Sequence, residues 1–271
     1  IILYFFTLDA KLGIYGLAGA YLLGWLLQAV ILVPPLGRLG FQYRPGFDFR
    51  SEGMKKVFAL MGPVMVSTWV QPINQAINGR FGSRLYGGAG MSALEYASNL
   101  YLVIAGIFIL SVTNVIFPRL SRLTAGGHEG EFWDTIRQTL GVCLFLVLPM
   151  SAGLTAVARP LISLIYGGGA FDAFSTEITA SALAWMSLGM TGYAVQNILS
   201  RAYFARQQGR VPLIAGGGAI LVNLLLCRAL THRFQVAGLA LSSAIAATVY
   251  ALLLLLPLQR SGERLLDGST L

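Results

Sequence analysis

Charged side chains are scarce in this sequence. Only 11% of its 271 residues are Asp, Glu, Lys or Arg, whereas soluble globular domains carry about 25%. Hydrophobic residues make up 56% of the chain, so there is too little polar surface to cover a soluble fold. The shortage of charge excludes a soluble protein and predicts one that is surrounded by a lipid bilayer.

Cysteine and histidine are also rare, with 2 of each. Cys143 and Cys227 lie inside apolar runs, which predicts free buried thiols rather than a disulfide framework or a metal site. His128 and His232 are isolated, and no glycine-rich phosphate loop or nucleophile with its base accompanies them. The sequence therefore favours no enzyme, no metal and no cofactor. The net charge of +8 lacks the aromatic and basic pattern of a nucleic-acid-binding surface.

Long apolar runs dominate what is present. A helix needs about 20 apolar residues to cross a hydrocarbon core of about 30 Å. Seven runs reach this length, at residues 12–33, 57–79, 92–117, 136–166, 178–204, 211–230 and 236–258. They predict an all-α integral membrane protein with about seven transmembrane helices. Residues 1–8 are apolar but too short to cross, and we expect them to be the remnant of an earlier transmembrane helix in a longer protein.

Basic residues are distributed unevenly over the connections between these runs. Thirteen of the 19 lie on one set of alternate loops, which includes residues 34–56 and 259–271, and 6 lie on the other set. By the positive-inside rule the first set faces the cytoplasm. The net charge is thus mainly an orientation signal, with some attraction to anionic headgroups. Arg228 and Arg233 oppose the rule, because they fall on the other side.

Polar side chains recur on one face of the second run. Ser67, Gln71, Asn74, Gln75 and Asn78 fall within an arc of about 100° on a helix. Such a stripe should not face lipid. Either the amides bond to neighbouring helices, at about 0.6 kcal/mol each, or they line a water-filled cavity. The number of polar groups on one face favours the cavity.

An ionisable residue lies inside the third run. Glu95 shares a helix face with Asn99, and a carboxylate about one turn inside a membrane helix is costly unless it is paired or hydrated. Two interpretations remain open. Glu95 either pairs with Arg80 or Arg84 across the short outer loop, or it lines the cavity and there holds an arginine or senses protonation.

A second polar pair lies near the cytoplasmic end of the fifth run. Asn197 and Arg201 are four residues apart and therefore share a helix face. They are candidates to bind a phosphate group. The alternative is that Arg201 extends to ordinary lipid headgroups.

Four strings in the chain are typical of one known family. They are ALEYASNL (93–100), NVIFPRLSRL (114–123), LIYGGGAFD (164–172) and ILSRAYFARQQGRVP (198–212). In order, spacing and loop side they resemble the lipid II flippase family, MurJ/MviN, over essentially the whole chain. The resemblance implies a partial two-lobe exporter-superfamily fold. Residues 9–33 would be the last helix of the first lobe, 34–56 a basic cytoplasmic inter-lobe linker, 57–258 a six-helix second lobe, and 259–271 a cytoplasmic tail or linker.

The resemblance also implies a function. Such a protein translocates undecaprenyl-diphosphate-linked peptidoglycan precursor between the leaflets of the bacterial cytoplasmic (inner) membrane, by alternating access of its lobes. Its expected partners are membrane lipid, the precursor, the missing N-terminal lobe of the same protein and cell-wall synthesis enzymes. The membrane potential or a coupling ion would drive it without a cofactor. Where relatives usually carry a cavity arginine this chain has Asn99, so Arg80 and Arg84 are the candidates to replace that contact.

Two other functions stay open. One is another exporter of the same superfamily, either a lipid-linked oligosaccharide flippase or a multidrug antiporter, for which Glu95 is the candidate carboxylate. The other is an inactive membrane scaffold for cell-wall enzymes, which the missing arginine favours. The candidate substrate-binding residues are Gln71, Asn74, Gln75, Asn78, Arg80, Arg84, Glu95, Asn99, Asn197 and Arg201.

Overall fold

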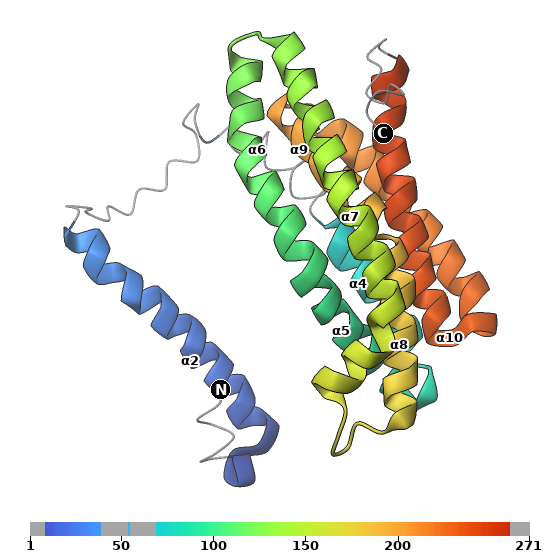
Figure 1. The fold of residues 1–271 in the computed structure, drawn as a ribbon. Helices are drawn as coiled ribbons and strands as arrows, with labels where there is room; N and C mark the ends of the chain where they lie inside the picture. The colour runs from blue at the N-terminus through green and yellow to red at the C-terminus, as the bar shows by residue number, and fades with distance from the viewer. Residues whose placement is uncertain (1–8, 39–53, 55–68, 261–271) are drawn as a thin grey trace. The chain divides into compact units, whose positions relative to one another are not determined.

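The computed structural model of the protein describes residues 9–38, 54 and 69–260 (Figure 1). The chain divides into two units, Ile1–Lys55 and Lys56–Leu271, and each is described by itself. In the first unit, helix α2 spans Asp9–Arg38. The predicted run ended at residue 33, whereas the helix continues through Pro34 and Pro35 to Arg38. They lie near its C-terminal end, where the missing backbone N–H groups remove only the last helical hydrogen bonds.

The second unit is a bundle of helices, and its described residues contain no named β-strand. Its elements are α4 (Val70–Gly82), a 3-10 turn η1 (Tyr86–Gly88), α5 (Ala89–Tyr101), a π-helical segment η2 (Leu102–Gly106), α6 (Ile107–Ala125), α7 (Glu129–Tyr166), α8 (Ala173–Leu188), α9 (Met190–Ala205) and α10 (Arg210–Arg260). Elements α5, η2 and α6 follow one another without a break and form one long rod. The predicted second run, 57–79, lies largely outside the described residues, and only its part from residue 69 onward can be placed.

Two helix breaks shape the bundle. The run predicted at 178–204 is two helices, α8 and α9, interrupted at Gly189. Helix α10 contains the two predicted runs 211–230 and 236–258, joined at Gln235, whose backbone is non-helical (φ 51°, ψ −124°). The two halves of α10 are antiparallel (Figure 1), and the Tyr250 hydroxyl of the second donates to the Pro212 carbonyl of the first at 3.1 Å.

Residues in the loops stabilise the ends of the helices. The Asp172 carboxylate caps α8 by accepting a hydrogen bond from the Ser175 backbone N–H at 2.8 Å. This bond favours the charged form and lowers the pKa of Asp172 below its usual value. Gly127, with φ 72°, makes the tight turn between α6 and α7, a conformation that glycine adopts without steric cost.

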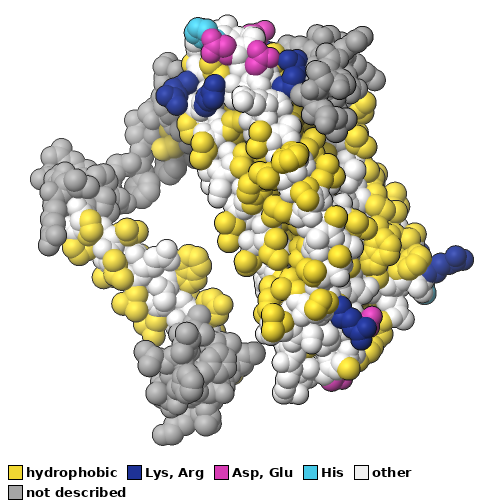
Figure 2. All heavy atoms as spheres, in the orientation of Figure 1, with side chains coloured by type: hydrophobic (Ala, Val, Ile, Leu, Met, Phe, Trp, Pro, Cys, Tyr) yellow, Lys and Arg dark blue, Asp and Glu magenta, His cyan; other side chains and the backbone are white. Residues whose placement is uncertain are grey.

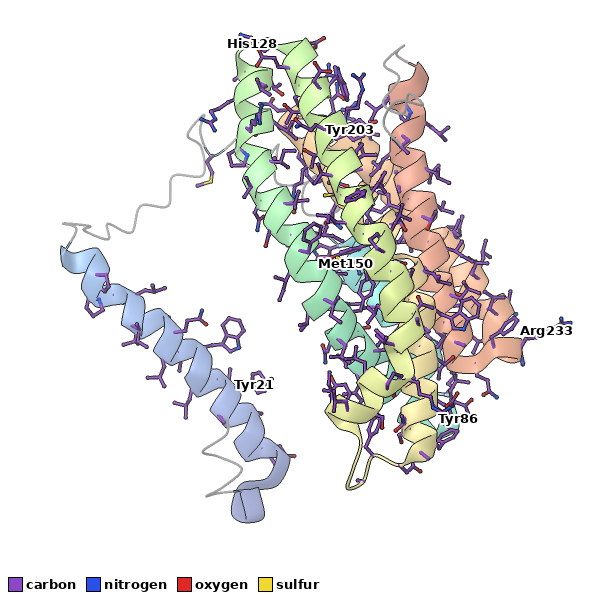
Figure 3. All side chains as sticks on the ribbon, viewed as in Figure 1. Tyr21, Tyr86, His128, Met150, Tyr203 and Arg233 are labelled. Carbon is purple, nitrogen blue, oxygen red and sulfur yellow. The ribbon has the colours of Figure 1, made fainter. Side chains whose placement is uncertain are left out.

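The surface of the second unit matches a bilayer. Large apolar side chains such as Val115, Phe145 and Ile214 are 79%, 78% and 75% exposed. Figure 2 shows apolar side chains over the middle of the bundle and charged ones at its two ends. We name these the His128 end and the Arg233 end, after residues labelled in Figure 3. Four helices in the described part are long and apolar enough to cross a membrane by themselves. The predicted all-α membrane fold is confirmed.

Candidate functional site

A polar cavity lies between α4, α5, α9 and α10. Helix α4 lines it with Gln71, Asn74, Gln75 and Asn78, four of the residues predicted from the polar stripe. The other helices contribute Ser98, Tyr101, Tyr193, Gln196, Ser243 and Tyr250. Its volume is about 90 Å³, which holds only a few water molecules. The stripe therefore forms one wall of a small polar space within the second unit.

Asn74 is the cavity residue with an unmet hydrogen-bonding capacity. Its Oδ1 atom is buried and accepts no hydrogen bond from the described residues. Buried polar atoms in folded proteins are nearly always paired with protein or with ordered water. A donor that enters the cavity, from water or from a ligand, would satisfy this oxygen.

Asn78, in contrast, forms hydrogen bonds to α10 through both its amide nitrogen and its amide oxygen. Its Nδ2 donates to Ser243 Oγ at 2.6 Å, and its Oδ1 accepts from Asn223 Nδ2 at 3.2 Å. The Cys227 thiol also donates to Asn78 Oδ1, at 3.2 Å. Asn223 and Cys227 are completely buried. Of the two interpretations of the stripe, interhelical bonding therefore describes Asn78, although that residue also borders the cavity.

The second polar pair lies on a neighbouring cavity of about 190 Å³. Asn197 and Arg201 line it together with Gln71 and Gln196, which also line the first cavity. The Asn197 amide donates to the Tyr193 carbonyl of its own helix at 2.8 Å. The Arg201 guanidinium lies 5.7 Å from the centre of the Phe117 ring, a cation–π contact. One continuous polar surface thus joins α4 to α9.

The remaining predicted residues do not reach these two cavities. Glu95 and Asn99 are exposed on α5 and line neither of them. The cavity face of α5 is formed by Ser98 and Tyr101. Because successive residues are about 100° apart on a helix, Asn99 projects away from that face. Among the described residues no ion pair joins Glu95 to Arg80 or Arg84. The first of the two interpretations of Glu95, pairing across the outer loop, is therefore not seen.

Arg80 and Arg84 also lie outside the polar cavity. Arg80 is exposed in the last turn of α4, and Arg84 lines a different cavity at the Arg233 end. Neither borders the polar cavity, so neither takes the place of a cavity arginine within the described residues of the second unit.

Sequence reasoning missed a second stripe and a buried amide. Tyr193, Gln196 and Ser200 line the cavities on α9. With Asn197 and Arg201 they occupy one helix face at spacings of three and four, a signal that the sequence contained. Asn223 is a single amide in an apolar run, and only its partners reveal its role. Cys143 and Cys227 are free and buried, as predicted. No group of three metal-ligating side chains occurs in residues that the structure describes.

An all-helical membrane bundle with a polar cavity between its helices is an architecture that membrane transporters have. The family model described as "Lipid II flippase MurJ" matches residues 1–269, and the chain belongs to this family. It is therefore a multi-pass bacterial membrane protein.

Individual relatives agree with this assignment. A probable lipid II flippase MurJ of Buchnera aphidicola is 30% identical over 238 residues, which is 88% of this chain and 46% of the relative. The lipid II flippase MurJ of Burkholderia cenocepacia is 28% identical over 256 residues, 93% of this chain and 49% of the relative. This chain spans about half the length of the curated relatives it matches.

Solved structures show the same fold. A lipid II flippase MurJ in an inward closed conformation superposes with a TM-score of 0.74 at 26% identity, covering 93% of this chain and 52% of that one. The Vibrio cholerae MATE transporter VcmN gives a TM-score of 0.72 at 16% identity, covering 97% of this chain and 59% of that one. The second likeness concerns the fold alone.

Proposed function

We propose that this chain is one lobe of a protein that moves undecaprenyl-diphosphate-linked peptidoglycan precursor from the inner to the outer leaflet of the bacterial cytoplasmic membrane. The match of the family model to residues 1–269 carries the proposal. The polar surface on α4 and α9 supports it, because a sugar and phosphate headgroup cannot cross about 30 Å of hydrocarbon without replacements for its water.

The size of the cavity indicates how the lobe takes part. Sites that enclose a small ligand measure about 300–1,000 Å³, whereas this cavity measures about 90 Å³. One lobe therefore offers a polar wall, and the rest of the protein supplies the opposite one. Rocking of two lobes about such a wall exposes it to each side of the membrane in turn.

The polar groups on this wall contact different parts of the substrate. Amides of Gln71, Asn74 and Gln75 replace water around the sugar hydroxyls, since amides both donate and accept hydrogen bonds. Arg201, on the adjoining cavity, provides a positive charge for the diphosphate. An inside-negative potential favours outward movement of negative charge by about 2.3 kcal/mol per charge per 100 mV. The substrate thus needs no nucleotide site to move in this direction.

The rival functions have less support. A drug antiporter would need a carboxylate in its cavity, and Glu95 lies outside both polar cavities. The scaffold alternative gives no role to the polar surface that joins α4 to α9.

The test is the double variant Asn74→Leu/Gln75→Leu in the full-length protein. We expect translocation to fall at least about tenfold, because lost polar contacts leave headgroup groups unpaired at about 1–3 kcal/mol each. Translocation is measured as surface exposure of the precursor in a flippase-depleted strain. Gln138→Leu is the matched control, because Gln138 is exposed on α7 and lines neither polar cavity. Normal translocation by the double variant, at equal membrane abundance, would refute the cavity assignment.

A further inference from the structure

A basic cavity lies at the Arg233 end, apart from the polar cavity. Its volume is about 490 Å³, and its lining includes Arg84, Arg228, Thr231, His232 and Gln235. Arg84 comes from the segment between α4 and η1. The others come from the end of the first half of α10 and its turn. The cavity thus bridges two elements that are distant in sequence.

Among the residues that the structure describes, the positive charge of this cavity has no counter-ion. No Asp or Glu lines it, and neither Arg84 nor Arg228 forms an ion pair within the described residues. Arg159 offers a contrast at the same end, since its guanidinium lies 3.3 Å from Glu177. The positive-inside bias also predicts few arginines on this side of the membrane. Neither pairing nor topology therefore explains Arg84 and Arg228.

The turn that shapes the cavity has an uncommon backbone. Gln235 has φ 51° and ψ −124°, although it carries a side chain. Such a conformation is strained for residues other than glycine and persists only where its surroundings enforce it. It directs the chain sharply from one half of α10 to the other, so that Arg228, His232 and Gln235 border one space.

We propose that this cavity binds a phosphate or diphosphate group at the membrane surface. Guanidinium groups match phosphate oxygens with two parallel hydrogen bonds each, which gives both charge and geometry. The Gln235 amide adds a neutral donor to the same space, whereas the Thr231 hydroxyl donates to the Cys227 carbonyl of its own helix. Its volume lies within the range of small-ligand sites, about 300–1,000 Å³. The site does not depend on the flippase proposal, because any phosphate-bearing lipid presents this chemistry.

The experiment measures binding of inorganic diphosphate to the purified full-length protein by equilibrium dialysis at low ionic strength. We expect saturable binding that weakens at least about tenfold in Arg84→Gln/Arg228→Gln, since hydrogen bonds to charged groups are among the strongest. Arg233→Gln is the control for the loss of a charge, and it is compared with Arg84→Gln alone, because Arg233 lies at the same end and does not line the cavity. Figure 3 shows Arg233 projecting from the bundle. The control should bind within about twofold of the unchanged protein.

Further variants and competitors complete the test. Arg84→Lys keeps the charge but loses the guanidinium fork, so it should bind more weakly than the unchanged protein and more tightly than Arg84→Gln. Thermal unfolding of each variant separates lost binding from lost folding. Displacement of diphosphate by phosphatidylglycerol in nanodiscs would assign the site to a phospholipid headgroup, and displacement by undecaprenyl diphosphate alone would assign it to the lipid carrier. Absence of saturable binding, or an equal loss in Arg233→Gln, would overturn the proposal. The translocation result for Asn74→Leu/Gln75→Leu bears on the proposed function alone and would leave this proposal unaffected.

Discussion

Replacing Gly192 by alanine should destabilise the second unit by about 3 kcal/mol, at the upper end of the usual cost of overpacking. A Cβ atom at Gly192 would lie 2.7 Å from both the backbone N and Cα of Thr248 in α10. These are helix backbone atoms, so no side-chain rotation relieves the collision. Helix α9 would have to move away from α10, which also threatens the 2.8 Å hydrogen bond from the Tyr203 hydroxyl to the Leu254 carbonyl. The measurement is thermal unfolding of the purified full-length protein.

Gly217→Ala is the matched control for this prediction. Gly217 is also a glycine of a long apolar helix, but a Cβ atom there would meet nothing within 4 Å. Because alanine is the better helix former by about 1 kcal/mol, this variant should unfold at the same temperature or higher. Equal unfolding temperatures for the two variants would show that α9 and α10 are not in close contact at Gly192.

The ends of α7 and the break at Gly189 show which parts of the fold the sequence could not predict. Apolar length predicted the existence of the helices, and α7 contains the whole predicted run 136–166. Its first turns were missed because they carry Glu129 and Glu131, which hydropathy excludes although a helix end outside the bilayer tolerates them. The break at Gly189 was missed for another reason. A Cβ atom at Gly189 would lie 2.5 Å from the Ala244 Cα, and such a partner on a distant segment leaves no local signal.

The candidate site was predictable where residues form a periodic pattern. The stripe on α4 placed Gln71, Asn74 and Gln75 on one cavity because helix periodicity alone aligns them. Asn99 lies on α5 as expected, but outside the cavity, because the rotation of a helix about its axis depends on its neighbours. Asn223 could not be predicted either, since a lone amide in an apolar run shows its role only through its hydrogen bond to Asn78.

Asn78→Leu should destabilise the second unit by about 2 kcal/mol, since it leaves buried polar partners without their hydrogen bonds. Asn223 would lose the acceptor of its Nδ2. The Cys227 thiol would lose its 3.2 Å contact to Asn78 and keep only the 3.7 Å contact to Asn223 Oδ1. Ser243 is less affected, because its hydroxyl also donates to the Leu239 carbonyl at 3.1 Å. The free energy of unfolding of the full-length protein in mixed micelles is the measurement.

Two further variants decide whether the network is the cause. Asn78→Leu/Asn223→Leu removes both partners, so it should cost less than the sum of the single changes, because fewer buried groups remain unpaired. Asn74→Leu should leave stability unchanged within about 0.5 kcal/mol or raise it, because the Asn74 Oδ1 accepts no hydrogen bond from the described residues. Equal destabilisation by Asn74→Leu and Asn78→Leu would refute this division of the stripe. If the two differ as expected, lost translocation in an Asn74 variant reports on the cavity wall, whereas the same loss in an Asn78 variant reports on the fold.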